Sequence, residues 1–243
     1  MQAKTEHHSF HQFLKSKWGL LLILAAVAGV VFWWWKSIPA SVPRGRVITH
    51  VPVIDAGHGG EDGGAPSISG VNESEINLEI SAKTEWLMRF YGIRPVVVRR
   101  EDISLHGPNA NTLREKKRED LKARVKIVED CPNAVLISIH QNTFSDAQYS
   151  GLQAFYSREY GSKELAEIIQ NMTQTSLDTN NTRSVSKVSD NVYLMDNVTC
   201  PAVLVECGFL TNIAEEQLLR DDTYQTKLAS VLLASFLQWE TME

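Results

Sequence analysis

The sequence has few cysteines: it contains three. An odd number leaves at least one thiol unpaired, whatever disulfides form. Cys200 and Cys207 flank the apolar segment PAVLVE. If this segment is a strand, their Cα atoms lie about 23 Å apart, which is beyond the reach of a disulfide. We therefore predict that no bridge joins these two residues and that the three thiols act as small buried hydrophobic groups.

Nucleotide-binding and peptidase motifs are also absent. Glycines are abundant in GHGGEDGGA at residues 57–65, but no G-K-[ST] or G-x-G-x-x-G pattern accompanies them. We therefore predict that the protein binds no nucleotide. The sequence also lacks the H-E-x-x-H pattern, which argues against a thermolysin-like zinc peptidase.

Positive charge is scarce in the C-terminal part of the chain. The whole sequence has 24 basic and 29 acidic residues, and six of the basic residues but only one of the acidic residues precede position 47. Residues 47–243 therefore carry a net charge of −10. A domain with this balance lacks the basic surface of a nucleic-acid-binding protein, so we predict no nucleic-acid partner.

One long uncharged run is present at residues 18–35, with the sequence WGLLLILAAVAGVVFWWW. A helix of this length can cross a thin bilayer, and tryptophans at both ends suit its two interfaces. The run is preceded by Lys4, Lys15 and Lys17, and basic residues favour the cytoplasmic side. We predict a single-pass transmembrane signal anchor, with residues 1–17 in the cytoplasm and the rest of the chain outside.

The segment after this run predicts a linker. Residues 36–46 contain two prolines, a glycine and three basic residues, which suits an extended stalk. The folded domain would then span residues 47–243. The small residues of SIPAS leave open a cleaved signal peptide as an alternative, but the apolar run is longer than the usual apolar core of such a peptide. We therefore favour the uncleaved anchor.

Apolar and amphipathic segments alternate through the domain. Six segments rich in β-branched or aromatic residues predict strands, at residues 50–56, 93–99, 134–140, 152–157, 191–196 and 202–208. Helical periodicity predicts helices at residues 73–91, 112–129, 162–177 and 222–239. Several strands are apolar on both faces, which is typical of a sheet covered on both sides. We predict an α/β fold with a single open, mostly parallel twisted sheet and helices on both of its faces.

Ionisable residues end three of the predicted strands: His58 follows VPVIDAG, His140 ends AVLISIH and Glu206 ends AVLVE. Functional groups of open α/β sheets gather beyond the carboxyl ends of the strands. Imidazole and carboxylate groups are zinc ligands, and a catalytic zinc has three protein ligands with one position open to water. His58 and His140 supply two of the three.

The third ligand should be a carboxylate near His58, and the candidates are Glu61, Asp62, Glu73 and Glu75. We favour Glu73 because it stands at the start of a predicted helix, after a glycine-rich loop that can fold it back toward the strand end. The spacing alone does not decide between these acids.

Four motifs occur in order along the domain: DAGHGGEDGGA, GVNESEINLEI, SIHQN and VLVECGFLTN. Together they resemble the zinc-dependent N-acetylmuramoyl-L-alanine amidases of the amidase type 3 family, over about residues 48–240. The resemblance implies that His58, Glu73 and His140 bind Zn²⁺ and that Glu206 is the catalytic carboxylate. It also implies cleavage of the amide bond between N-acetylmuramic acid and L-alanine in peptidoglycan, the predicted partner. Together with the predicted anchor, this predicts a protein of the bacterial cell membrane.

Three further residues are candidates beside these motifs. Asp55 and Asn142 lie next to the histidines in the sequence and could orient them, although hydrogen bonding within the loops is an equal alternative. Gln141 stands where many members of the family have a small residue, and we predict that it narrows the choice of muropeptide. The compact one-domain layout and SGLQAFYS most resemble sporulation or germination members.

Two other functions stay open on the sequence. One is a wall-binding or scaffold protein that keeps the fold without turnover, but such a protein has no chemical need for Glu206. The other is an exported zinc peptidase, which would differ in the bond that it cleaves.

Overall fold

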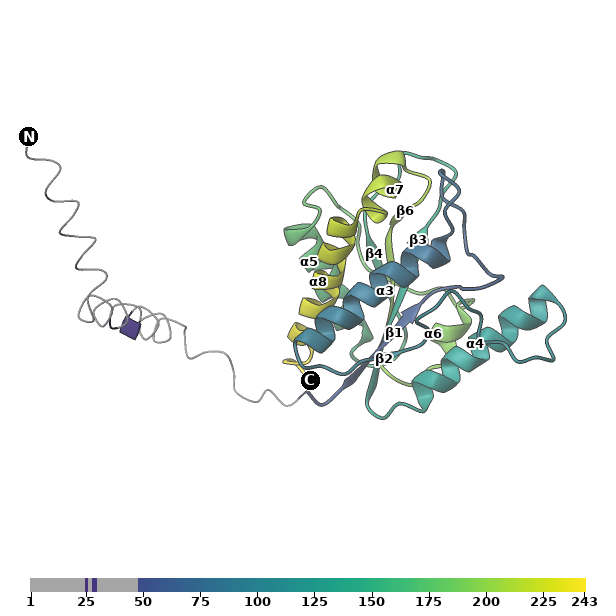
Figure 1. The fold of residues 1–243 in the computed structure, drawn as a ribbon, viewed down its shortest axis with the longest axis horizontal. Coiled ribbons are helices and arrows are strands. Elements are labelled where there is room, and N and C mark those ends of the chain that lie inside the picture. The colour runs from purple at the N-terminus through teal and green to yellow at the C-terminus, as the bar shows by residue number, and fades with distance from the viewer. Residues whose placement is uncertain (1–24, 26–27, 30–47) are drawn as a thin grey trace, which may run out of the picture. The chain divides into compact units, whose positions relative to one another are not determined.

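The computed structural model describes residues 48–243, together with Ala25, Ala28 and Gly29 (Figure 1). Ile48–Glu243 form one compact unit, the domain. The predicted boundaries at residues 17, 35 and 46, and nearly all of the predicted apolar span, lie outside the described residues.

The predicted membrane location is corrected by the structure. In the part of the chain that the structure describes, no helix combines the length and the apolar character that a membrane crossing requires. The prediction rested on the apolar run at residues 18–35, on the tryptophans at its two ends and on the preceding lysines.

The described domain is built on a six-stranded sheet in the order β2-β1-β3-β6-β4-β5. Neighbouring strands are parallel except β4 and β6, which pair antiparallel. The strands are β1 (Val51–Ala56), β2 (Val96–Val97), β3 (Ala134–Asn142), β4 (Gln153–Tyr156), β5 (Ser186–Lys187) and β6 (Ala202–Phe209). The α/β class and the mostly parallel sheet are confirmed.

Helices cover both faces of the sheet. They are α3 (Glu73–Phe90), α4 (Leu113–Glu129), α5 (Ser162–Ser176), α6 (Tyr193–Asn197), α7 (Ile213–Leu219) and α8 (Asp222–Trp239). On one face, α3 and α5 contact the sheet and both pack on α8, while α4 and the short α6 lie against each other on the other face (Figure 1). The second face is therefore covered by less helix than the first.

Alternation along the central strands divides the core between these faces. Ile54, Ile137 and Val205 belong to the apolar cluster that includes residues of α3, α5 and α8. Their neighbours Leu136 and Leu204 belong to the cluster on the side of α4 and α6. Successive residues of a strand point to opposite faces of the sheet, so residues two positions apart along one strand share a face. His140 and Glu206 therefore share the face of α4 and α6.

One strand prediction was wrong. The segment NVYLMD at residues 191–196 contains α6 instead, because Leu194, Met195 and Val198 are all buried in the cluster beside α4. Burial of two successive residues and of the residue three positions later suits a helix, whereas a strand would bury alternate residues. A short apolar run does not distinguish the two by periodicity.

The three cysteines are free in the structure. Cys207 is buried, as predicted, while Cys131 and Cys200 are half-buried. The prediction that no disulfide joins Cys200 to Cys207 is confirmed, and Cys207 lies within the extended strand β6 that begins after Cys200.

Candidate metal and catalytic site

The carboxyl ends of β1, β3 and β6 bring the predicted ionisable residues to one edge of the sheet. These three strands are neighbours and parallel, and His140 is the register partner of Glu206. His58 follows β1 after a single glycine, and its ring lies against the ring of His140 with 5.0 Å between the centroids. The topology therefore produces the convergence that the strand ends predict.

The loop that carries His58 is held by two buried arginines. Arg99 donates through Nη2 to the carbonyl of Gly57 at 3.0 Å, and Arg124 donates through Nη2 to the carbonyl of His58 at 2.6 Å. Both arginines also donate to the carbonyl of Ala56, at 2.9 and 2.8 Å. His58 has a φ of 60°, a conformation that non-glycine residues adopt rarely and that needs support from its surroundings.

Glu73 reaches the same edge from the first residue of α3. The amide of Glu73 donates to the carbonyl of Ala65 at 3.0 Å, which folds the glycine-rich loop back onto the start of the helix. Its Oε1 lies 3.0 Å from His140 Nδ1, and its Oε2 lies 3.3 Å from His58 Nε2. The amide of Gln141 also donates to Oε1, at 3.1 Å. Two imidazole rings therefore converge on one buried carboxylate.

His58, Glu73 and His140 each offer one nitrogen or oxygen atom, and these atoms lie within 4.8 Å of one another. Two imidazole nitrogens and one carboxylate oxygen form a donor set that zinc accepts. Burial works against the charge of Glu73, but hydrogen bonds from both histidines hold its pKa below the usual value. Burial also acts to lower the pKa of His58, yet Asp62 and Glu73 raise it to about 9. Asp62 and Glu73 thus surround His58 with negative charge, which suits a cation that takes the place of the proton on His58.

Glu206 stands beside this cluster with an unused oxygen. Its Oε2 is buried and has no hydrogen-bond partner among the described residues. Burial raises the pKa of Glu206 to about 7, with the charge of Glu73 adding to the effect and that of His140 opposing it. A carboxyl group with such a pKa exchanges a proton readily near neutral pH.

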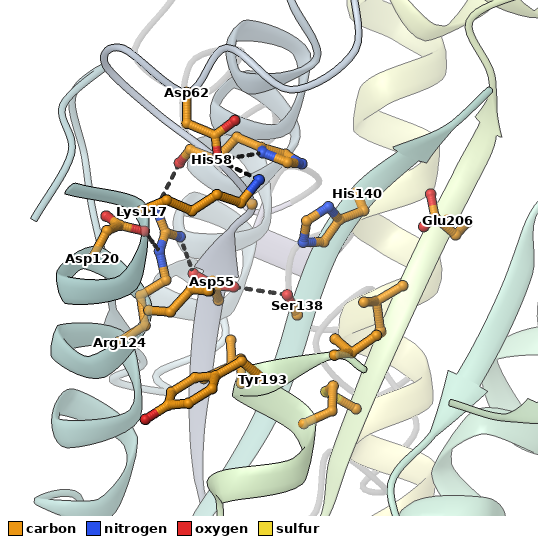
Figure 2. Close-up of a pocket in the computed structure, with 16 residues that line it drawn as sticks. Asp55, His58, Asp62, Lys117, Asp120, Arg124, Ser138, His140, Tyr193 and Glu206 are labelled. Atoms are coloured by element: carbon orange, nitrogen blue, oxygen red, sulfur yellow. Dashed lines mark hydrogen bonds and ion pairs between the residues drawn. The ribbon is translucent and has the colours of Figure 1, made fainter. Parts of the chain in front are cut away.

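A pocket of about 250 Å³ opens along the face of α4 and α6 and includes both histidines and Glu206. Figure 2 shows His140 and Glu206 projecting from adjacent strands into it, with Lys117 and Tyr193 on the side of the two helices. Asp62 lies 3.1 Å from His58 Nδ1 and 3.0 Å from Lys117 Nζ. Asp62 thus contacts the ring nitrogen of His58 that faces away from Glu73.

The structure gives Asp55 partners other than a histidine. Asp55 accepts hydrogen bonds from Arg124 Nη1 at 2.5 Å and from Ser138 at 2.7 Å. Burial acts to raise its pKa, but the charge of Arg124 and the bond from Ser138 outweigh burial and hold the pKa below its usual value. Asp55 therefore acts on the site through the arginine that holds His58, and its predicted contact with a ring stays a prediction.

Gln141 and Asn142 follow His140 at the end of β3. Gln141 is buried, and its Nε2 donates to Asn77 Oδ1 at 3.0 Å. Asn77 in turn donates to Glu73 Oε1 at 3.3 Å. The carbonyl of Asn142 accepts from the amide of Leu210 at 2.8 Å. The predicted roles of Gln141 in substrate choice and of Asn142 beside the histidine stay predictions.

The remaining candidate acids lie apart from the cluster. Glu61 forms an ion pair with Lys116, and Glu75 is exposed on α3. Sequence reasoning did not find Arg99 and Arg124, because their partners are backbone carbonyls far along the chain. The available signal was the spacing of Asp120 and Arg124, four residues apart on one helix and bonded at 2.7 Å.

We expect Gly57→Ala to lower activity and zinc affinity by about 10- to 100-fold, as loss of the supporting contacts of a metal ligand does. A Cβ at residue 57 would overlap the ring of His140, so the ring must leave its position. Gly107→Ala is the matched control, because its new Cβ meets only the end of the Glu119 side chain at 3.3 Å. Turnover and zinc affinity measured on both variants would contradict the account if Gly57→Ala matched the control.

Comparisons with known proteins agree with this geometry. The family described as N-acetylmuramoyl-L-alanine amidase (Amidase_3) matches residues 53–236. The germination-specific N-acetylmuramoyl-L-alanine amidase of Bacillus subtilis is 35% identical over 206 residues, which cover 84% of each chain.

Two solved structures are similar to the described fold. The CwlD amidase from Clostridioides difficile, in complex with the GerS lipoprotein, is 36% identical with a TM-score of 0.76, covering 80% of this chain and 100% of that one. An N-acetylmuramoyl-L-alanine amidase from Clostridium difficile 630 is 28% identical with a TM-score of 0.68, covering 79% and 97%. The extent of the family match and these identities show that the chain belongs to the N-acetylmuramoyl-L-alanine amidases of the Amidase_3 family, hydrolases of the cell wall.

Proposed function

We propose that His58, Glu73 and His140 bind a zinc ion and that Glu206 is the general base of a peptidoglycan amidase. The observation that carries the proposal is the placement of Glu206 beside the three-residue cluster, as the register partner of His140. Membership of the amidase family supports the reaction, and the donor set supports the metal.

The residues present fit a cation and its bound water. The buried Oε2 of Glu206 has no partner among the described residues, although buried polar atoms are nearly always hydrogen-bonded. A water molecule held between the cluster and Glu206 would supply that partner. Glu73 is also charged and buried, and its ion-pair partners in residues 48–243 are the two histidines, with no lysine or arginine. A cation that takes the place of the proton on His58 would therefore meet the charge of Glu73.

Zinc, when bound, supplies a water of lowered pKa and polarises a carbonyl oxygen. Glu206 would accept a proton from the attacking water through a carboxylate oxygen as the oxygen of that water adds to the lactyl carbonyl carbon. The C–N bond to L-alanine then breaks, and Glu206 returns the proton to the leaving nitrogen. The products are a free lactyl carboxylate on the sugar and a stem peptide that begins with L-alanine.

The likeness to a germination-specific amidase supports a role for this activity in spores. The substrate class is peptidoglycan, in which a glycan strand carries stem peptides. We propose no nucleotide or nucleic-acid ligand, in keeping with the acidic charge of the domain.

We expect purified residues 46–243 to release stem peptides from muropeptides only when zinc is present. A chelator should abolish release, and added zinc should restore it, because the three ligands bind the cation reversibly. Mass spectrometry of the products identifies the bond: peptides that begin with L-alanine together with sugars that bear a free lactyl carboxylate. Cleavage inside the stem peptide would instead show a peptidase, and full activity in the chelator would refute the metal mechanism.

A further inference from the structure

A row of polar side chains continues from the catalytic site across the same face of the sheet, from β3 over β6 to β4. His140 on β3 pairs in register with Glu206 on β6, and Glu206 pairs in register with Gln153 on β4. Register partners on neighbouring strands project from the same face of a sheet. Gln153 therefore lies on the catalytic face directly beyond Glu206, on the side away from His58.

Arg183 completes the row. Its Nη1 donates to Gln153 Oε1 at 3.1 Å, and its Nε donates to the carbonyl of Ser150 at 2.7 Å. The guanidinium also lies over two aromatic rings, 4.4 Å from the centroid of Phe209 and 5.8 Å from that of Tyr149. These contacts fix the plane of the guanidinium, whereas Nη2 makes no hydrogen bond within residues 48–243. A half-buried arginine is thus held by Gln153, the strand neighbour of the catalytic carboxylate, with Nη2 unused.

The charge of Arg183 also lacks a counterion. Lys117 and Arg124, the other cations of the catalytic face, are paired with Asp62 and Asp55. No ion pair involves Arg183 in the described part of the chain. Glu215 feels its charge, but that carboxylate is bonded to the amides of Gly151 and Phe209. In a domain of net charge −10, an ordered and unpaired arginine is suited to an anionic group of a ligand.

The position of Arg183 selects one side of the scissile amide. The lactyl carboxyl of the sugar is consumed in that amide, so a free carboxylate close to the bond belongs to the peptide. Neighbouring strands lie about 4.8 Å apart, which puts Gln153 about 10 Å from His140. An extended peptide advances about 3.3–3.6 Å per residue, so the second stem residue lies about 7 Å beyond the amide, within reach of the Arg183 guanidinium.

We infer that Arg183 binds a stem peptide that carries a free carboxylate on its second residue, and thereby sets the direction in which the substrate lies across the site. This inference rests on the proposed function. The peptide then runs over Gln153 toward Arg183, which leaves the pocket between α4 and α6 to the sugar side of the amide. An arginine with a free edge accepts a carboxylate in a planar, two-bond geometry that lysine does not reproduce.

The test uses two synthetic muramoyl tripeptides that differ at one group. In the first, the unlinked carboxyl of the second residue is free; in the second, it is a carboxamide. We expect the zinc-loaded wild type to favour the first by about 10-fold or more in kcat/KM, mainly through KM, since a hydrogen bond to a charged group contributes that much. Arg183→Gln should bring the ratio close to one, and Arg183→Lys should give an intermediate ratio.

The substrate ratio separates recognition from loss of structure, because a destabilised variant loses activity on both compounds alike. Arg89→Gln, which removes an exposed charge in the last turn of α3, is the matched control and should keep the wild-type ratio. Equal kcat/KM for the two compounds in the wild type, or an unchanged preference in Arg183→Gln, would overturn the inference while leaving the amidase intact. Cleavage of neither compound by the wild type would refute the proposed function itself.

Discussion

Replacing Glu206 by glutamine lowers kcat by about a thousandfold on our account, a loss typical of a missing general base. The amide of glutamine keeps the size of the side chain but cannot accept the proton of the attacking water. Glu206 stands outside the group of residues that converge on the metal position, so zinc should still bind with a stoichiometry of one. The measurement is kcat on a muropeptide together with zinc content after dialysis.

Glu129→Gln provides a matched control for this substitution. Glu129 accepts hydrogen bonds from Thr199 at the far end of α4 and is exposed. The Glu129→Gln substitution should leave kcat unchanged. A Glu206→Gln enzyme with more than a tenth of the wild-type kcat would show that another group takes the proton. If Glu206→Gln preserved the cellular role of the protein, the wall-binding alternative would gain support.

The second large effect is expected at Glu73. We expect Glu73→Gln to weaken zinc binding by at least about 100-fold, because a neutral amide replaces the one anionic ligand of the set. Turnover should fall with zinc occupancy and recover in part at high zinc concentration. Competition against a coloured chelator measures the affinity directly, without reference to activity.

Glu75→Gln tests the same chemistry two residues further along the helix. Glu75 belongs to the same first turn of α3 but is exposed, so its substitution should change neither zinc affinity nor turnover. If Glu75→Gln lost zinc and Glu73→Gln retained it, the ligand assignment would be wrong.

The sequence predicts those site residues that stand at the carboxyl ends of the strands. His58, His140 and Glu206 could be predicted because parallel strands end at one edge, and the structure places all three there. The candidate Glu73 required the resemblance to the family, since its position depends on a loop that bends back through the bond from its amide to Ala65. Spacing along a chain does not determine the path of such a loop.

Long-range side-chain contacts could not be predicted from the sequence. Arg124 is separated from Asp55 by 69 positions and Arg183 from Gln153 by 30, and neither pairing follows from a local pattern. The short helix α6 was also missed, because a run of five residues is too short to show helical periodicity and its apolar and aromatic residues are also typical of a strand. This helix matters for the site, since Tyr193 and Met195 line the catalytic pocket.

The central claim is that one zinc ion sits between His58, Glu73 and His140, beside Glu206. The most direct measurement is anomalous diffraction from crystals of the zinc-loaded domain, collected on either side of the zinc absorption edge. We predict one anomalous peak at about 2.0–2.2 Å from a nitrogen of each histidine and from an oxygen of Glu73. A peak at another position, or none in crystals of an active enzyme, would contradict the account.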